Sequence, residues 1–224
     1  MPVTLHVWRV PRRRIGAAML RIGLQRRPPA ARFVKFLGTG SGFEVKDADL
    51  TRYAAVTVSD EPLAFPAWDR LAVQRATVDL EPLASRGSWS GKTPFSVDKS
   101  RKSDGMVLAL TRARLRPSRT LTFWRAIPPV VRELDAAPGL LAGFGIGEAP
   151  IGWQGTVSVW RDGADLTRFA YRQPEHRAVI ARTPRDRWYA EELFARFAVR
   201  GIAGDRSLLG WREEGPHGEG QTEA

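Results

Sequence analysis

Short runs of alternating apolar and polar residues recur along the chain, and they predict β-strands. In the first run, over residues 3–10, Val3, Leu5 and Val7 share one face. Further strands are expected at 32–40, 52–59 and 76–84. Apolar residues at helical spacing predict a helix over 15–27 and a short helix over 65–75. The first part of the chain therefore reads strand, helix, strand, strand, helix, strand.

The same order starts again after about residue 105. Strands are expected at 106–115, 140–148, 156–161 and near 192–199, and helices at 117–135 and 165–183, the latter with a break near Pro174. Landmarks recur about a hundred residues apart: Trp8-Arg-Val10 with Thr111-Arg-Ala113, Leu37-Gly-Thr-Gly40 with Phe144-Gly-Ile-Gly147, and Val56-Thr-Val-Ser59 with Val157-Ser-Val-Trp160. This self-similarity predicts a duplicated βαββαβ unit.

Each such ferredoxin-like unit is an antiparallel sheet with helices on one face, so its other, apolar face must be covered. We therefore expect an α+β protein in which two units form a dimeric α+β barrel-type sandwich, with ligand space between the sheet and its helices. The expected organisation is a first repeat at 1–90, a polar, lysine-rich linker at 91–104, a second repeat at 105–203, and an extension at 204–224 whose end is disordered.

Composition narrows the class of protein. A hydrophobic content of 43% is enough for a packed core. The absence of cysteine excludes disulfides, zinc–thiolate sites and iron–sulfur clusters. No run approaches the roughly 18–20 apolar residues of a membrane span, and the first residues do not resemble a secretory signal, so we expect a cytoplasmic protein.

The formal net charge of +11 suggests an acidic partner. The helix expected at 15–27 is basic and amphipathic, and it could make a peripheral contact with an anionic membrane; equally, it could be a solvated basic face over a core stripe. Nucleic acid is disfavoured because the basic residues are scattered and no recognition helix or RNP-like motif is present. A homo-oligomer is a further expectation.

His176, one of three histidines, follows Pro174 and Glu175 and precedes apolar residues. This pattern is typical of a helix start, where a neutral imidazole could ligate a metal; alternatively His176 is a surface or capping residue. His6 is expected to be packed on a sheet face, and His217 lies in the polar tail.

No nucleophile elbow, His-Glu-x-x-His motif or aspartate-rich metal box is present, so a cofactor is the natural source of difficult chemistry. A histidine with many Trp, Phe and Arg residues suits haem b, which needs an axial iron ligand, an apolar slot and cations for its propionates. His176 is the candidate ligand of the iron. Candidates for the slot and the propionates are Arg114, Trp160, Phe169, Tyr171, Arg172 and Trp188, although each aromatic could simply belong to the core. Arg112 could polarise a bound oxygen or be a structural ion pair, and Glu148 could act in acid–base chemistry or only fix the turn after Gly147.

Several motifs together resemble the spheroidene monooxygenase family: Arg86-Gly-Ser-Trp-Ser-Gly91, Leu110-Thr-Arg-Ala-Arg114 with Phe123-Trp124, Phe144-Gly-Ile-Gly-Glu-Ala-Pro150, and Phe169-Ala-Tyr to His176 with Trp188-Tyr-Ala-Glu-Glu-Leu-Phe194. The resemblance covers most of residues 1–203. It implies a haem-dependent oxygenase that introduces a keto group into acyclic carotenoids. It also implies a fold like the chlorite dismutase and aldoxime dehydratase groups. His176 matches the family's histidine; its assignment as the proximal ligand is our hypothesis.

We therefore expect a haem-dependent monooxygenase that uses dioxygen or peroxide, an electron donor and a small hydrophobic substrate, either carotenoid-like or another secondary metabolite. One alternative keeps the haem but catalyses dehydration or bond formation at nitrogen, as in the aldoxime dehydratase-like group. Another is a non-catalytic basic barrel that binds a ligand. Dependence on oxygen and reductant would separate the two enzymes.

Overall fold

Each half of the chain folds into the expected βαββαβ unit. The computed structural model describes residues 2–98, 100–148, 153–172 and 188–212. The first unit consists of β1 (Val3–Arg9), α1 (Ile15–Leu24), β2 (Ala31–Gly40), β3 (Ala48–Ser59), α2 (Pro66–Asp69) and β4 (Gln74–Gly87). The second consists of β5 (Val107–Leu115), α3 (Thr120–Asp135), β6 (Leu140–Glu148), β7 (Trp153–Trp160), α4 (Gly163–Arg172) and β8 (Tyr189–Gly204). Single turns of 3-10 helix lie at η1 (Arg12–Arg14), η2 (Val45–Asp47), η3 (Pro117–Arg119) and η4 (Arg206–Leu209).

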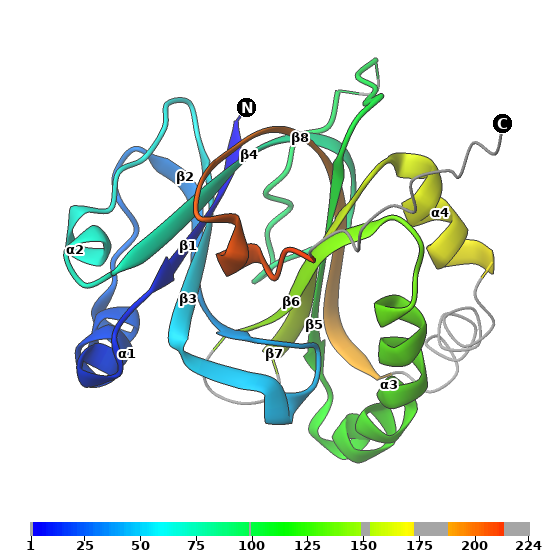
Figure 1. Cartoon of the computed structure of the whole chain (residues 1–224), viewed down its shortest axis with the longest axis horizontal. Helices are drawn as coiled ribbons and strands as arrows, with labels where there is room; N and C mark the ends of the chain where they lie inside the picture. Colours follow the sequence, from blue (N-terminus) through cyan, green and yellow to red (C-terminus); the bar gives the residue numbers. More distant parts are fainter. Residues whose placement is uncertain (1, 99, 149–152, 173–187, 213–224) are drawn as a thin grey trace, which may run out of the picture.

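The strands close into one barrel in the order β1-β3-β2-β6-β7-β5-β8-β4 (Figure 1). The two repeats join at two unequal seams. The β4–β8 seam is long and runs from Ala76 opposite Gly204 to Gly87 opposite Leu193. The β2–β6 seam has only two registered pairs, Gly38 with Gly147 and Thr39 with Ile146. The predicted α+β barrel of duplicated ferredoxin-like units is confirmed.

The barrel interior is the main core. Alternate residues of every strand point inward because side chains alternate between the two faces of a strand. They include Leu5, Val56, Leu110 and Phe144, all buried. Residues beyond the strands help to fill the interior, notably Leu208 and Leu209 of η4 and Phe95 of the segment between β4 and β5.

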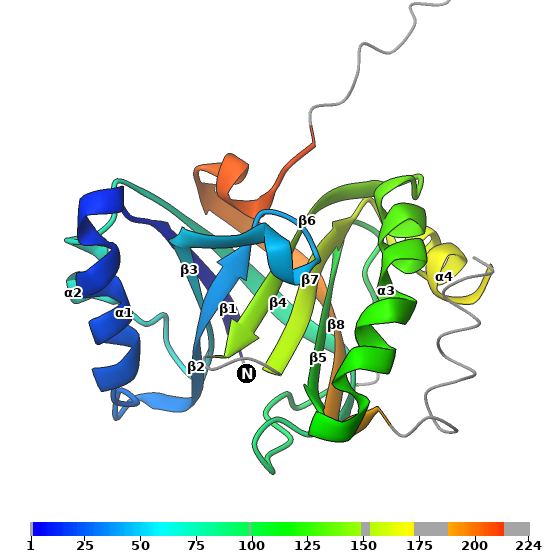
Figure 2. The same ribbon diagram turned by 90° about the horizontal axis from the view of Figure 1, so that it is seen from below.

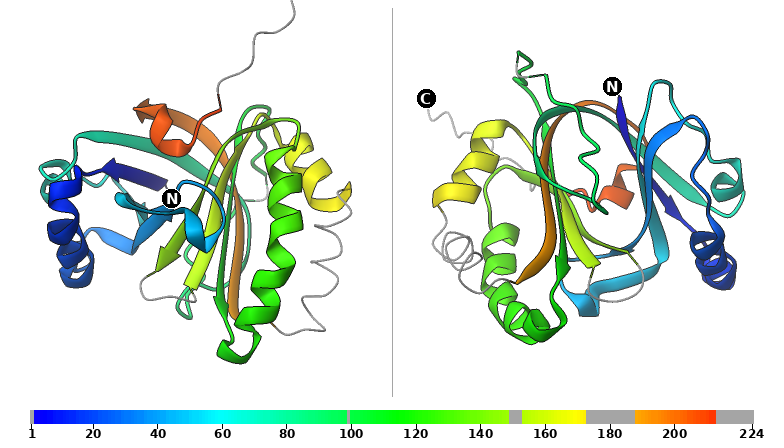
Figure 3. Two further views of the ribbon diagram at one scale, coloured as in Figure 1. Left: turned by 60° about the horizontal axis from the view of Figure 1, so that its bottom comes forward. Right: turned by 180° about the vertical axis from the view of Figure 1, so that it is seen from behind.

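The segment between β4 and β5, which contains the predicted linker, packs against the barrel at Phe95. Phe95 is 5% exposed and packs edge-to-face on Phe197, with ring centroids 4.9 Å apart. A second ring contact joins Phe95 to Phe33 at 6.3 Å. The segment crosses the end of the barrel (Figure 3). A single buried aromatic thus anchors an otherwise polar stretch.

The helices cover the outside of the barrel in two pairs. Figure 2 shows α1 and α2 over the first repeat, and α3 and α4 over the second. The second pair is longer: α3 has 16 residues and α4 has 10, whereas α2 has 4. Pro128 and Pro129 lie inside α3. Because proline has no N–H, the carbonyls of Trp124 and Arg125 lack their usual helical donor there.

Element boundaries differ from the predictions mainly at the ends. The first helix ends at Leu24 rather than 27, and the expected helix at 65–75 is only Pro66–Asp69. The last strand starts at Tyr189, because the charged residues Glu191 and Glu192 belong to it. Polar residues obscured that strand in the sequence, since one of its faces is not an apolar core.

Candidate functional site

The outer face of the first repeat is filled by aromatic side chains. Trp8 on β1 lies opposite Tyr53 on β3, and both are buried. The Trp8 ring stacks on Trp68 of α2, with centroids 5.4 Å apart, and Phe36 stacks on the same ring at 6.0 Å. Phe65 packs edge-on against Trp8. These side chains therefore fill most of the space between this sheet and its helices, although Tyr53 also lines the cleft described below.

The strand registers show which positions of the second repeat correspond to this aromatic layer, and small residues occupy them. Leu37 lies opposite Ala54 in the first repeat, as Phe144 lies opposite Val157 in the second. The same register makes Thr111 on β5 the equivalent of Trp8, because Trp8 pairs with Tyr53 and Thr111 pairs with Thr156. The landmarks at residues 8 and 111 and at residues 37 and 144 are thus structural equivalents.

The third sequence landmark is displaced by two residues. The register makes Ala54 the equivalent of Val157, so that Val56 corresponds to Val159. The error arose because all of these residues point inward and are small or branched, and a shift of two preserves the alternation.

The small outer-face residues of the second repeat form the floor of a cleft of about 1080 Å³. Its roof comes from α3 and α4 and is apolar. The cleft is lined on the sheet side by Ala109, Thr111, Ala113, Gly145, Gly147, Gln154, Thr156, Ser158 and Phe194, and on the helix side by Phe123, Ile127, Val130, Val131, Leu134, Leu166 and Phe169. This volume lies at the upper end of the range typical of small-molecule sites.

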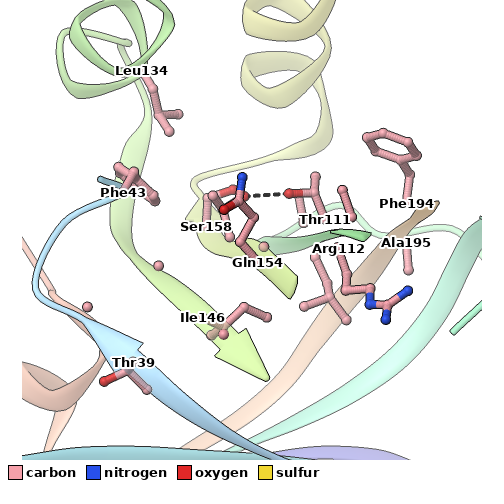
Figure 4. A pocket seen from close by; sticks show the side chains of 18 of the residues that line it. Thr39, Phe43, Thr111, Arg112, Leu134, Ile146, Gln154, Ser158, Phe194 and Ala195 are labelled. Atoms are coloured by element: carbon pink, nitrogen blue, oxygen red, sulfur yellow. Dashed lines mark hydrogen bonds between the residues drawn. The ribbon is translucent and has the colours of Figure 1, made fainter. Parts of the chain in front are cut away.

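Hydroxyl and amide groups supply the polarity of the floor (Figure 4). The Oγ1 atoms of Thr111 and Thr156 are 2.7 Å apart and share one hydrogen bond. Because one of the two donates to the other, the second retains a proton that it can donate to a ligand. Ser158 Oγ accepts a hydrogen bond of 2.9 Å from Trp160 Nε1, which leaves the Ser158 hydroxyl as a further possible donor.

The β2–β3 loop of the first repeat, residues 41–47, reaches across to the second repeat and forms one end of the cleft. Gly145 N–H donates a 2.7 Å hydrogen bond to the Gly42 carbonyl. A Cβ at Gly145 would lie 2.7 Å from that carbonyl oxygen, and one at Gly143 would lie 2.7 Å from Phe43 Cζ. Phe43 packs with Leu134 and its neighbours beside the cleft. The glycines of β6 therefore allow the loop to lie directly on the strand.

Arg112 lies on the opposite face of β5 from Thr111, next to the barrel interior. Its side chain is 2% exposed, and Nε donates a 3.1 Å hydrogen bond to Glu148 Oε1. Nη1 donates to Glu191, and the guanidinium lies 5.9 Å from the Trp89 ring centroid. Lys35 Nζ lies 3.0 Å from Glu148 Oε2. Arg112 and Glu148, the two predicted catalytic residues, therefore belong to one ionic network, and both are among the residues that line the cleft.

Hydrogen bonds determine the charge of Glu191 in this network. Burial alone would raise the pKa of its carboxyl group. Donation from the Gly91 N–H, from Arg112, and from Ser88 and Ser90 outweighs that effect and lowers the pKa to about 2. Glu191 is therefore a carboxylate at neutral pH and balances the charge of Arg112.

The candidate cofactor residues are distributed around the cleft. Trp160 and Phe169 both line it, and their ring centroids are 5.2 Å apart. Tyr171 lines its edge and is 69% exposed. Trp188 is fully buried beside Phe123, with centroids 5.7 Å apart, and is not among the cleft-lining residues.

The remaining candidates are Arg114, Arg172 and His176, of which the structure describes the first two. Arg114 is exposed on β5 and is not among the residues that line the cleft. Arg172 is the last residue of α4, the helix that contributes Phe169 to the roof. His176 lies outside the described residues, four positions further along the chain.

Sequence reasoning missed the floor of the cleft, namely Thr111, Gln154, Thr156 and Ser158. The available signal was the replacement of an outward Trp8 by an outward Thr111 in the repeated pattern. This replacement marks the position at which the second repeat lacks the large side chain that packs under the helices of the first repeat.

Comparison with known proteins shows the family of the chain. It is 31% identical over 198 residues to the spheroidene monooxygenase of Rhodobacter capsulatus, an alignment that covers 81% of this chain and 82% of that protein. It is 35% identical over 187 residues to the spheroidene monooxygenase of Rubrivivax gelatinosus, covering 79% and 72%. The chain belongs to the spheroidene monooxygenase family. These relatives support a monooxygenase, and hence an oxidoreductase. No protein-family model matches the chain.

Solved structures with the same architecture include two of aldoxime dehydratase. One has a TM-score of 0.55 at 11% identity and covers 88% of this chain and 80% of that chain. The other, in complex with butyraldoxime, has a TM-score of 0.54 at 9% identity and covers 88% and 79%. At this level of identity the likeness shows the fold alone, and it agrees with the duplicated barrel.

The cleft suits a flat, hydrophobic cofactor such as haem. Its floor is built mainly of small side chains on three adjacent strands, β6, β7 and β5, together with Gln154 and, from β8, Phe194, and its roof is apolar. Such a space accepts a planar group that a Trp8-like side chain would exclude. Among the described residues, no group of three or more His, Asp or Glu side chains forms a metal site. A haem iron would instead need a single axial donor, which the chain offers after α4 in His176.

Proposed function

We propose that this protein is a haem-dependent monooxygenase that oxygenates a hydrophobic, carotenoid-like substrate. The observation that carries the proposal is the contrast between the repeats: the first packs Trp8 and Trp68 under its helices, whereas the second has small residues there and contributes most of the lining of a cleft of about 1080 Å³. Met19, Ile22 and Tyr53 of the first repeat line the cleft from its other side. Relatives named spheroidene monooxygenase support the substrate class.

His176 is proposed as the axial ligand of the iron. When bound, haem supplies the redox chemistry needed to activate oxygen, which amino-acid side chains alone do not provide. The support is positional: α4 contributes Phe169 and Ala170 to the roof of the cleft, and His176 follows Arg172, its last described residue, by four positions in the sequence.

The other residues of the cleft bind and orient. The apolar roof, including Ile127, Val131 and Phe169, excludes water and accepts the hydrocarbon of a substrate. The hydroxyl pair of Thr111 and Thr156 is the polar feature of the floor and can donate one hydrogen bond to an oxygen atom held above it. Arg112 and Glu148 are also among the residues that line the cleft, and their ion pair links β5 to β6.

Absorption spectroscopy of the purified protein after addition of haem tests the cofactor assignment. We expect a Soret band with one haem per chain, and a shifted or lost band in His176→Ala. Imidazole added to His176→Ala should restore the band of the unsubstituted protein. An unchanged spectrum in His176→Ala would refute the role of this histidine.

Turnover with an acyclic carotenoid then tests the reaction. The proposal predicts an oxygenated product only when both dioxygen and a reductant are present. Conversion of an aldoxime without net oxidation, and no product from the carotenoid, would contradict it.

A further inference from the structure

The outward face of α1 is apolar, which is unusual for a helix on a protein surface. Ala18 and Ile22 face the barrel and pack in the first-repeat cluster. On the other side of the helix, Leu20 is 63% exposed and Leu24 is 70% exposed. The only charged residue within the ten residues of α1 is Arg21. A helix that is apolar on both sides needs a second apolar contact beyond its own core.

The chain around α1 is strongly basic. Residues 9–43 contain no Asp or Glu, and their basic residues are Arg9, Arg12, Arg13, Arg14, Arg21, Arg26, Arg27, Arg32 and Lys35. Arg12 and Arg13 are exposed immediately before the helix. An exposed apolar face flanked by arginines fits the headgroup region of an anionic membrane, where hydrocarbon and phosphate lie at adjacent depths.

A second element of the same character lies across the molecule from α1. Residues 105–132 also lack Asp and Glu. At the start of α3, Leu121 is 62% exposed, and Arg116, Arg119 and Arg125 are exposed around it. Figure 1 shows α1, the 41–47 loop and the start of α3 along the same edge of the protein, and Figure 2 shows the loop between the two helices. Two acid-free elements thus flank one face.

The cleft opens toward the same face. Met19 of α1 and Leu50 near the start of β3 both line the cleft, and each is 56% exposed. Tyr171 lines it from α4. Three separate elements therefore contribute exposed apolar side chains to the rim of the cleft, whose lining also includes Glu44 and Asp49. A hydrophobic molecule could move from a bilayer into the cleft along this rim without crossing water.

We propose that the face formed by α1, the start of α3 and the cleft rim docks on an anionic lipid bilayer, so that the cleft takes its substrate directly from the membrane. The occupant is the bilayer rather than a second copy of the chain, because a two-fold contact through this face would bring the arginines of both copies together. The identity of the substrate rests on the function proposed above, whereas the docking does not. No helix in the described part of the chain is long and apolar enough to cross a membrane.

Sedimentation with lipid vesicles, with no haem or substrate required, tests the docking. We expect binding to vesicles of phosphatidylcholine with phosphatidylglycerol, much weaker binding to phosphatidylcholine alone, and loss of binding at high salt. Leu20→Ser with Leu24→Ser should weaken binding at least about tenfold, whereas Leu20→Met with Leu24→Met should retain it. Leu20 and Leu24 are both exposed in the structure, so the barrel should fold in each double variant.

A matched pair of charge variants separates local from general attraction. Arg12→Gln with Arg13→Gln should weaken binding about 30-fold, the effect of removing two basic residues from an anionic surface. Lys92→Gln with Lys102→Gln removes the same charge from exposed residues of the β4–β5 segment and should leave binding unchanged. Equal losses in the two pairs, or no binding by the unsubstituted protein, would overturn the proposal. So would Leu20→Ser with Leu24→Ser if it dissociated an oligomer without affecting vesicle binding.

Discussion

Thr111 occupies in β5 the position that Trp8 occupies in β1. The cross-strand partners match as well, because Trp8 faces Tyr53 and Thr111 faces Thr156. The two repeats therefore differ in the layer between the sheet and its helices. In the first repeat this layer is a packed core, and in the second it is part of a cleft. The difference lies in a few side chains on one face of the sheet, not in the backbone.

The filled layer should contribute strongly to stability. Trp8→Thr would place the small residue of the second repeat into the first, and it would also remove the 2.9 Å hydrogen bond from Trp8 Nε1 to Asp69. We expect a loss of about 3–5 kcal/mol in the free energy of unfolding, measured by urea denaturation. A loss below about 1 kcal/mol would show that this layer is not a packed core.

The seat of the 41–47 loop on β6 should be sensitive to a single methyl group. Gly145→Ala brings Cβ to 2.7 Å from the Gly42 carbonyl oxygen, so either the loop or the strand must move. We expect a destabilisation of about 1–3 kcal/mol and faster proteolysis of the loop. The control is Gly38→Ala, whose Cβ would make only an ordinary 3.8 Å contact with the Gly147 carbonyl. Similar effects of both substitutions would contradict this role for Gly145.

His6 should make stability depend on pH in a defined window. Burial lowers the pKa of His6 from 6.5 to about 4, and Asp69 only partly opposes this. The unfolded chain therefore binds the proton more readily, and stability falls as the pH decreases from about 6.5 to 4, by at most about 3 kcal/mol. Denaturation of His6→Phe should be nearly independent of pH across this window. Equal slopes in both proteins would exclude His6 as the cause.

Arg112 should be needed for the stability of the barrel. Arg112→Met leaves the Glu148 and Glu191 carboxylates without their shared partner, and we expect a loss of about 3 kcal/mol. Because the pKa of Glu191 is lowered to about 2, its contribution is present above pH 4.5 and is lost as the pH falls toward 2. The destabilisation by Arg112→Met, measured by urea denaturation, should therefore shrink in that acidic range, which overlaps the window of His6 only between pH 4.5 and 4. A destabilisation that stays constant there would contradict the pairing.

Much of the fold could be predicted from the sequence because its strands alternate clearly and the pattern repeats. Val3, Leu5 and Val7 all point into the barrel, as their spacing requires. The same alternation also indicates that Arg112 shares a face with Leu108 and Leu110, so its place inside the barrel was available from the sequence. What alternation cannot show is which helices cover which face, and hence that Thr111 and Ser158 form the floor of a cleft.

Contacts between the two repeats were harder to predict because the residues that make them are distant in sequence. Phe43 reaches the second repeat only because the barrel brings β2 and β6 together. Lys35 and Glu148 pair across 113 positions of the chain. Local patterns carry no signal for such contacts. The role of His176 stays a prediction, since it lies outside the described residues.

The most direct test of the account is a haem titration of Thr111→Trp, followed by visible absorption, beside the unsubstituted protein and the control Thr111→Val. The indole of Thr111→Trp should close the cleft as Trp8 closes the first repeat, so we expect a folded protein that has lost haem binding, while Thr111→Val still binds one haem per chain. Full haem binding by Thr111→Trp would show that the cofactor is held elsewhere and would contradict the central claim.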